Sequence, residues 1–222
     1  MVAVDGPAGS GKSTVARRVA LVLGLRYLDT GAMYRALTWW MLGQGIDVSD
    51  AAAVLARLGE PRITVVPDAA APRIYVDGRD VAVPIRTREV SNAVSLVAAL
   101  PPVRDLLIGM QRRIIAEPAE PAGIVAEGRD IGTVVAPDAA VKVYLTASED
   151  ARARRRSADL AADPAATVDA TRREQATRDR LDAAQMVMAA DAVPIDTTGV
   201  GVDDVVARIV GLVRARQAMS GG

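Results

Sequence analysis

The stretch Gly6-Pro7-Ala8-Gly9-Ser10-Gly11-Lys12-Ser13, close to the start of the chain, decides the fold. It matches the pattern G-x-x-x-x-G-K-S/T in full. Glycine lets the backbone wrap so that successive N–H groups point into one concavity, where an anion replaces water. A helix that follows adds the positive end of its dipole. The stretch therefore predicts a loop that binds the phosphates of a nucleoside triphosphate.

Two side chains of this loop have defined parts in that chemistry. The ammonium group of Lys12 is expected to reach the β- and γ-phosphates, and the hydroxyl of Ser13 is expected to ligate Mg²⁺. Lys12 is one of two lysines, beside Lys142, among 27 lysine and arginine residues. The residues expected to contact the nucleotide are Gly6, Pro7, Ala8, Gly9, Ser10, Gly11, Lys12, Ser13 and Thr14.

The segments on either side supply the context that a phosphate loop requires. Residues 1–5 form a short apolar run that predicts a strand. Residues 13–23 place Val15 and Val19 on one face, as an amphipathic helix does, and Gly24 is suited to end that helix. The alternative is a glycine-rich turn that binds no ligand. The strand before the loop and the helix after it favour the phosphate loop over this alternative.

The rest of the chain alternates between apolar runs and charged helical stretches, as an α/β protein does. Further strands are expected at residues 123–126, 141–145 and 193–196. Further helices are expected at residues 32–42, from Glu149 onward, at 169–184 and at 202–216. Residues 159–168 are rich in alanine, aspartate and proline, which predicts a turn between two of these helices.

Residues 62–83 interrupt this alternation. Residues 63–66 and 73–77 alternate as antiparallel strands do, and Asp77-Gly78 favours a hairpin turn. Pro101-Pro102 is expected to separate a helix over 87–100 from a second helix over 103–116. We predict a P-loop NTPase-type parallel β-sheet flanked by helices, with an inserted small β-containing subdomain and a helical lid. The predicted division is residues 1–60 and 118–222 for the core, 61–117 for the insert and about 150–185 for the lid.

Composition limits the function further. The 222 residues carry 27 basic and 27 acidic side chains, so the chain lacks the basic surplus typical of nucleic-acid-binding proteins. Cysteine and histidine are both absent, which excludes disulfides and argues against a zinc site. No apolar run reaches the ~18 residues that suggest a membrane span. These features predict a cytoplasmic protein that binds neither membranes nor nucleic acid.

Polar residues follow the apolar run that ends at Leu28. Thr30 stands at the start of a predicted helix, and Arg35 follows about one turn later. A hydroxyl and an arginine at a helix start suit a phosphate group. Taken singly, Thr30 is better explained as a helix N-cap and Arg35 as a solvated helix residue.

A second polar segment, Glu127-Gly128-Arg129-Asp130, ends another apolar run. In open α/β sheets, ligands bind at the carboxyl ends of the strands. Arg129 suits bidentate contact with a phosphate, and the two carboxylates suit base or sugar donors, or a metal-bound water. The alternative is a turn closed by its own ion pairs.

Arginines crowd two predicted helices on either side of residues 159–168. They are Arg152, Arg154, Arg155, Arg156, Arg172, Arg173, Arg178 and Arg180. Phosphoryl transfer needs cations over the migrating group and the exclusion of water, and a lid of arginines provides both. The alternative is a solvated helical hairpin held by ion pairs one turn apart.

Together these motifs resemble the bacterial cytidylate kinases of the nucleoside monophosphate kinase family. The resemblance covers nearly the whole chain, in D-G-P-A-G-S-G-K-S-T, L-D-T-G-A-M-Y-R, R-T-x-E-V-S-N-A-V-S with P-x-V-R after it, E-G-R-D-I-G-T-V-V-x-P-D-A and R-A-x-R-R. The second and fourth of these are specific, because adenylate and thymidylate kinases do not carry that pair. A β-subdomain inserted at about 60–100 is also typical of the bacterial family.

The resemblance implies a role for each matching position. The residues that would hold the CMP phosphate are Thr30, Arg35 and Arg129. Those that would read the cytosine edge are Ser95, Arg104 and Glu127, with Asp130 beside the sugar and base. On the lid side, the residues that would face the ribose are Arg178 and Asp182. Catalysis would depend on Lys12, Arg129, Asp130, Arg154 and Arg178.

The activity that the resemblance implies is ATP-dependent phosphorylation of CMP, and of dCMP, to the diphosphate. Transfer would be direct and in line, with Mg²⁺ bound by Ser13 and the nucleotide. The implied partners are these small molecules alone, and the implied state is a monomer.

The chain departs from the family after Asp182. The family usually continues with an arginine three residues later and then a Ser/Ala-Pro-Leu segment, whereas Gln185 stands in that place and residues 183–190 are several residues shorter. Two other functions therefore stay open. One is a kinase of another small acceptor, and the other is a nucleotide-binding regulator whose altered lid has lost catalysis.

Overall fold

The computed structural model describes residues 1–120, 123–159 and 167–220. Its contacts group the chain into two compact units: residues 1–28 with 118–222 (unit 1), and residues 29–117 (unit 2). Residues 29–60 are thus grouped with the predicted insert, while the predicted boundaries of functional domains stay a prediction. Most of the turn predicted at 159–168 lies outside the described residues.

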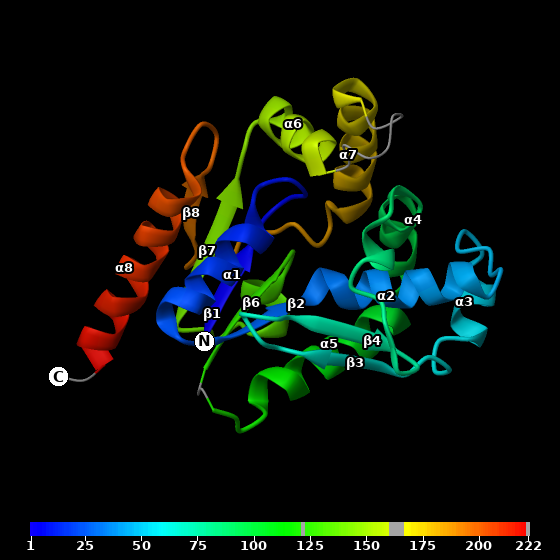
Figure 1. Cartoon of the computed structure of the whole chain (residues 1–222), viewed down its shortest axis with the longest axis horizontal. Coiled ribbons are helices and arrows are strands. Elements are labelled where there is room, and N and C mark those ends of the chain that lie inside the picture. Colours follow the sequence, from blue (N-terminus) through cyan, green and yellow to red (C-terminus); the bar gives the residue numbers. More distant parts are fainter. Residues whose placement is uncertain (121–122, 160–166, 221–222) are drawn as a thin grey trace. The chain divides into compact units, whose positions relative to one another are not determined.

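Unit 1 is built on a five-stranded sheet in the order β2-β6-β1-β7-β8 (Figure 1). The strands are β1(Val2–Asp5), β2(Arg26–Asp29), β6(Ile124–Gly128), β7(Val141–Thr146) and β8(Val193–Asp196). Parallel registers place Val4 between Glu127 of β6 and Val143 of β7, and β8 is parallel to β7. The predicted parallel sheet is confirmed, and its carboxyl ends bring Asp5 beside Gly128.

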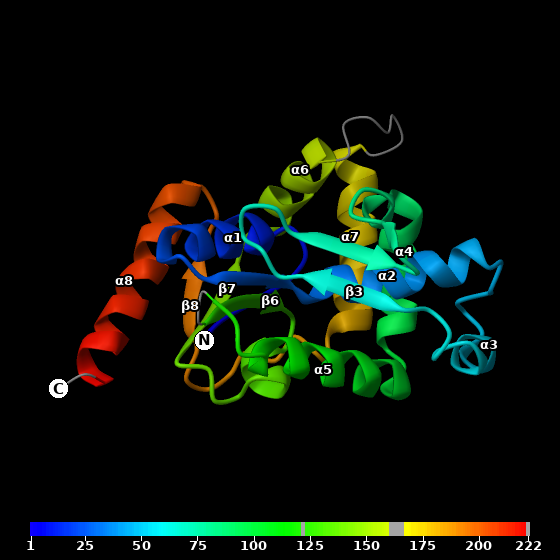
Figure 2. The same ribbon diagram turned by 60° about the horizontal axis from the view of Figure 1, so that its bottom comes forward.

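The described part of unit 1 has a short π-helix, η2(Ile131–Val135), and four α-helices. The α-helices are α1(Lys12–Leu23), α6(Glu149–Asp159), α7(Val168–Asp182) and α8(Val202–Ser220). Helix α1 packs against α8 and contacts β1 and β6, while α6 packs against α7 (Figures 1 and 2). Val15 and Val19 are buried as predicted, and Gly24 ends α1 with a φ of 62°. The largest fully buried side chains of this core are Leu28, Ile124, Ile131, Leu145 and Ile209.

Unit 2 combines helices with a small antiparallel sheet in the order β3-β4-β5. Its elements are α2(Thr30–Gly43), α3(Ala51–Ala56), β3(Ile63–Val66), β4(Arg73–Val76), β5(Arg79–Asp80), α4(Arg88–Ala98) and α5(Pro101–Ala116). Helix α2 contacts α4, α5, β3 and β4. The buried side chains at its core are Met33, Leu37, Met41, Ile85 and Leu107.

The structure differs from the expected elements of residues 29–117 in four places, and one of them is a short 3-10 helix, η1(Pro84–Arg86), that was not expected. The predicted hairpin turn is confirmed, with φ values of 51° at Asp77 and 79° at Gly78, and a third strand, β5, follows it. Helix α3 was not expected. Pro101 and Pro102 form the first turn of α5 instead of preceding it, because a proline there gives up only an N–H that the helix leaves unbonded.

Within the described ranges 1–120, 123–159 and 167–220, no single helix is long and apolar enough to cross a membrane. Helices α4 and α5 meet the criteria of length and composition only as a pair, which is bent by 102°.

Candidate active site

The phosphate loop connects β1 to α1, as the sequence predicts. Gly6, Gly9 and Gly11 have positive φ values of 146°, 76° and 90°. A Cβ atom at Gly6 would lie 2.2 Å from the backbone oxygen of Leu145, so the loop passes β7 at a distance that only glycine permits. Gly11 is the N-cap of α1 and has no side chain to bond the first-turn N–H groups, which suits that end of the helix to an anion.

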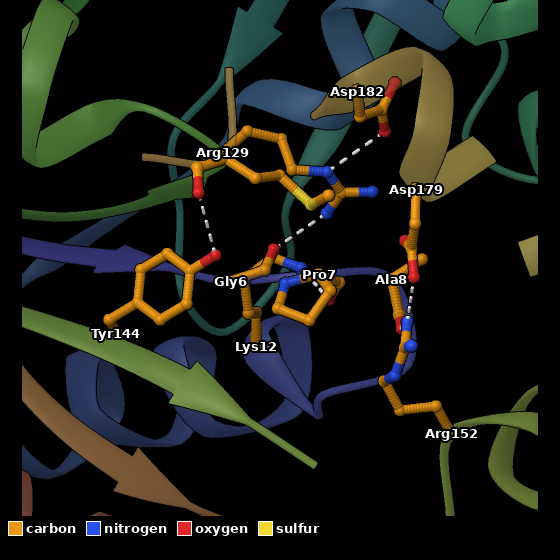
Figure 3. Close-up of polar contacts among 10 residues, drawn as sticks. Gly6, Pro7, Ala8, Lys12, Arg129, Tyr144, Arg152, Asp179 and Asp182 are labelled. Atoms are coloured by element: carbon orange, nitrogen blue, oxygen red, sulfur yellow. Dashed lines mark hydrogen bonds and ion pairs between the residues drawn. The ribbon is translucent and has the colours of Figure 1, made fainter. Parts of the chain in front are cut away.

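Five successive carbonyl oxygens of the loop, those of residues 6–10, accept hydrogen bonds from side chains of unit 1. Figure 3 shows the first three of these bonds. In the order of the acceptors, the donors are Arg129 (2.9 Å), Lys12 (2.8 Å), Arg152 (3.2 Å), Arg155 (3.4 Å) and Thr197 (3.0 Å). In a trans peptide the C=O and the following N–H point in opposite directions. A carbonyl that is held in place therefore also fixes the direction of the N–H group that follows it, and such N–H groups are what a phosphate loop offers to its ligand.

The carboxyl end of β1 holds the turn that follows β6. Asp5 is buried, and its two carboxylate oxygens accept from the backbone N–H groups of Ile131 and Gly132, each at 2.8 Å. Burial raises the pKa of Asp5 above its ordinary value, and the two amide bonds offset part of that rise. Asp5 was not among the predicted site residues, although it stands, like Glu127, near the carboxyl end of an apolar strand.

Arg129 joins the phosphate loop to α7. Its Nη1 donates to the carbonyl of Gly6, and its Nε donates to Asp182 at 3.2 Å (Figure 3). Two residues predicted to bind CMP are thus in contact within unit 1. Asp130 and Arg178, which belong to the same predicted set, are each 7% exposed.

Glu127 makes a buried contact that the sequence did not predict. The hydroxyl of Tyr27, on the neighbouring strand β2, donates to its Oε1 at 2.7 Å. Both residues are less than 5% exposed. The phenol therefore fixes one oxygen of a carboxylate that was predicted to read a base.

The arginines of α6 divide between loop contacts and solvent. Arg152 pairs with Asp179 at 2.6 Å besides its bond to Ala8 (Figure 3), and Arg155 binds Thr197 besides its bond to Gly9. Arg154, which was predicted to be catalytic, is exposed, and that role stays a prediction.

On α7, the solvated interpretation holds for three exposed arginines, Arg172, Arg173 and Arg180. Arg172 pairs with Asp150 at 2.9 Å and with Asp169 at 3.5 Å, and all three side chains are more than 40% exposed. Such pairs stabilise a helical hairpin only weakly.

The segment after α7 is attached to β7 at two points. The hydroxyl of Tyr144 donates to the carbonyl of Met186 at 3.3 Å, and Lys142 pairs with Asp191 at 2.8 Å. Gln185 donates its backbone N–H to the carbonyl of Asp182. The segment after α7 is therefore held in place by contacts with the sheet.

Unit 2 carries the remaining predicted residues, Thr30, Arg35, Ser95 and Arg104. Asp29 caps α2 by accepting from the N–H of Ala32 at 2.9 Å, so Thr30 is not the N-cap. Arg35 donates to the hydroxyl of Ser91 at 2.8 Å, a partner that the sequence did not indicate.

Ser95 lies one turn after Ser91 on the same face of α4. Its side chain is 2% exposed, and its hydroxyl has no hydrogen-bond partner among the residues that the structure describes. A buried hydroxyl in this state suits a ligand that supplies the missing bond.

The parallel sheet, the glycine loop and its ring of side-chain donors define a P-loop phosphotransferase. A protein-family model described as cytidylate kinase matches residues 2–215. The cytidylate kinase of Streptomyces avermitilis is 49% identical over 222 residues, covering 98% of this chain and 94% of that protein. The cytidylate kinase of Streptomyces coelicolor is 50% identical with the same coverage. The chain therefore belongs to the cytidylate kinase family and is a nucleoside monophosphate kinase.

Among solved structures, shikimate kinase from Acinetobacter baumannii in complex with shikimate matches with a TM-score of 0.44 and 16% identity. The match covers 96% of this chain and 92% of that one. The similarity is too low to bear on the activity.

Proposed function

We propose that the chain transfers the γ-phosphoryl group of ATP to CMP, and to dCMP, to form the nucleoside diphosphate. Membership of the cytidylate kinase family supports CMP as the acceptor. The observation that carries the proposal is the double contact of Arg129, which bonds the phosphate loop at Gly6 and the predicted ribose ligand Asp182. One guanidinium thus touches both the donor loop and a residue of the acceptor set.

The donor would bind with its phosphates against the backbone N–H groups that residues 6–14 offer. Lys12 has three N–H donors, so one can stay on the carbonyl of Pro7 while another reaches a phosphate oxygen. Ser13 is exposed in the first turn of α1, which suits its hydroxyl to a magnesium ion shared with the nucleotide. When bound, Mg²⁺ neutralises charge on the phosphates.

Transfer would be in line, with an oxygen of the CMP phosphate attacking the γ-phosphorus and ADP leaving. A phosphate dianion needs little help from a base, so the protein's part is to position both groups and to neutralise charge. Lys12, Arg129 and Arg178 would serve that purpose, with Arg154 added from the lid.

On the acceptor side, Thr30 and Arg35 would bind the CMP phosphate, and Ser95, Arg104 and Glu127 the cytosine. Cytosine offers an amino donor at N4 and acceptors at N3 and O2, which a carboxylate and two donors complement. Uracil would turn its O4 toward Glu127, so that two acceptors face each other, and the same residues would reject it.

The test measures ADP release by the purified chain with ATP, Mg²⁺ and each of CMP, dCMP, UMP and AMP. We expect turnover with CMP and dCMP and little with UMP or AMP. Turnover only with a different small acceptor would replace the proposal with the first alternative. Tight ATP binding without ADP release in the presence of CMP would identify a nucleotide-binding regulator.

A further inference from the structure

Thr197, the residue after β8, connects three parts of unit 1. It is 3% exposed, and its Oγ1 lies 3.0 Å from the carbonyl of Ser10, the carbonyl of Thr146 and Nη1 of Arg155. A hydroxyl has one proton and two lone pairs, so it accepts from Arg155 and shares its proton between the two carbonyls. Its backbone N–H also donates to Thr146 at 2.8 Å, which fixes the residue on the end of β7.

Arg155 grips Thr197 on a second side. Its Nη2 donates to the carbonyl of Thr197 at 2.6 Å, while Nη1 also reaches the carbonyl of Gly9 at 3.4 Å. One guanidinium therefore bonds the hydroxyl and the carbonyl of one residue and the phosphate loop as well. Because a guanidinium is planar and rigid, these three contacts fix their acceptors relative to one another.

The loop needs such external contacts at this point. Ser10 stands between Gly9 and Gly11, both in the left-handed region of φ. Glycine restricts its own rotation little, so the peptide between Ser10 and Gly11 has weak local reasons to keep one orientation. If that peptide rotated by about half a turn, the N–H of Gly11 would point away from the phosphates of a bound nucleotide.

We propose that Thr197, together with Arg155, is a positioning residue for the phosphate loop. By holding the carbonyl of Ser10, the hydroxyl keeps the N–H of Gly11 directed toward the phosphates of the donor. The inference rests on the proposed binding of ATP by this loop. It deepens that proposal by assigning part of the affinity for ATP to a residue that follows the last strand, β8. Neither side chain needs to touch the nucleotide for this role.

The test compares Thr197→Val, which removes the hydroxyl at nearly constant volume, with Thr197→Ser, which keeps it. Thr171→Val is the matched control, because Thr171 is 1% exposed and its hydroxyl has no partner among the described residues. The measurements are KM for ATP, KM for CMP, kcat and the thermal midpoint of unfolding. Calorimetric titration with ATP in the absence of CMP gives a readout that does not depend on turnover.

We expect Thr197→Val to weaken ATP binding roughly tenfold, as the loss of one buried hydrogen bond does, and to leave KM for CMP unchanged. Thr197→Ser should restore ATP binding, and Thr171→Val should match the wild type. Arg155→Leu should weaken ATP binding as well, and the double variant should lose less than the two single losses combined, because both act on one network.

Wild-type ATP affinity in Thr197→Val, or equal losses for ATP and CMP, would overturn the inference. If Thr197→Val does not fold, Arg155→Leu with normal ATP affinity would overturn it in the same way. A wild-type chain that binds ATP but does not phosphorylate CMP would refute the proposed function alone, since the calorimetric comparison of the variants would still decide the role of Thr197.

Discussion

The backbone carbonyls of the phosphate loop and the Ser95 hydroxyl of helix α4 differ in their hydrogen-bond partners. In the loop, all five carbonyl oxygens of residues 6–10 accept from side chains of the protein. On α4, the buried hydroxyl of Ser95 has no partner among the described residues. The loop is therefore held in its binding shape by the protein itself, whereas α4 presents a group whose missing partner is best supplied by a ligand.

This contrast separates two kinds of binding residue. Removal of a side chain that bonds the loop breaks hydrogen bonds within the protein as well as any contact with a nucleotide. Removal of the Ser95 hydroxyl breaks no hydrogen bond with the residues that the structure describes, so its effect should appear only when the ligand is present. Five substitutions test this difference and the contacts around the site, beginning with the largest expected effect.

Lys12→Ala should reduce phosphoryl transfer at least about a hundredfold, because the ammonium group stabilises charge on the transferring phosphates. Turnover with saturating CMP and ATP measures it. Lys12 also bonds the carbonyl of Pro7, so the unfolding midpoint of the variant should be recorded beside its activity. Near-normal turnover would remove Lys12 from the mechanism.

Asp5→Asn should lower the free energy of unfolding by about 2 kcal/mol, because an amide accepts from only one of the two backbone N–H groups that the carboxylate now holds. Chemical denaturation measures the change. An unchanged free energy of unfolding would contradict the role given to these two bonds.

The pH dependence of the free energy of unfolding, compared between the wild type and Asp5→Asn, supplies a second readout. The pKa of Asp5 in the folded protein is raised above 3.8, so the stability that its protonation contributes is greatest below pH 3.8 and is lost as the pH rises through the native pKa. The Asn variant should lack that decline. Parallel stability profiles for the two proteins would mean that Asp5 does not titrate differently on folding.

Ser95→Ala should raise KM for CMP about tenfold and leave both KM for ATP and the unfolding midpoint unchanged, because the hydroxyl has no hydrogen bond in the described part of the chain. Ser91→Ala, one turn earlier, is the contrasting variant. It breaks the bond from Arg35 and should lower stability by about 1 kcal/mol. An equal loss for ATP and CMP in Ser95→Ala would place this hydroxyl outside the acceptor site.

Asp191→Asn should have the smallest effect, because the carboxylate of Asp191 is exposed to water and the buried Lys142 keeps its hydrogen bond to the carbonyl of Pro137. The hydrogen bond from Lys142 holds the pKa of Asp191 below 3.8. Its contribution to stability is therefore present above pH 3.8 and is lost as the pH falls through the native pKa. Unfolding midpoints of the two proteins should differ slightly at neutral pH and converge in acid.

The sequence predicted the regions in which neighbouring residues decide the structure. The phosphate loop, the cap at Gly24 and the hairpin at Asp77-Gly78 depend on glycine at fixed offsets, and all three are confirmed. The start of α5 was predicted two residues too late, because a proline pair can either precede a helix or form its first turn. Strand β5 was not predicted, because a strand of two residues is too short to show an alternating pattern.

The contacts that shape the site could not be predicted in the same way. Tyr27 meets Glu127, and Thr197 meets Ser10, only because the sheet order places distant strand ends side by side. Asp5 and Thr197 share one signal, a polar residue at the carboxyl end of an apolar strand, and a search of every strand end would have found both. Ser91 carries no such signal, since a serine inside a helix is ordinary.

The backbone contact at Gly6 has a consequence for how the chain tolerates change. Because any side chain there would collide with the main chain of Leu145, which cannot give way as a flexible side chain does, saturation mutagenesis should recover glycine alone at this position. Gly24 also has a positive φ, but among the described residues no atom beyond its chain neighbours would lie within 4 Å of a Cβ there, so asparagine should survive at modest loss. Two glycines of one loop–helix unit would then yield opposite profiles in a selection experiment, one set by a collision and the other by backbone preference.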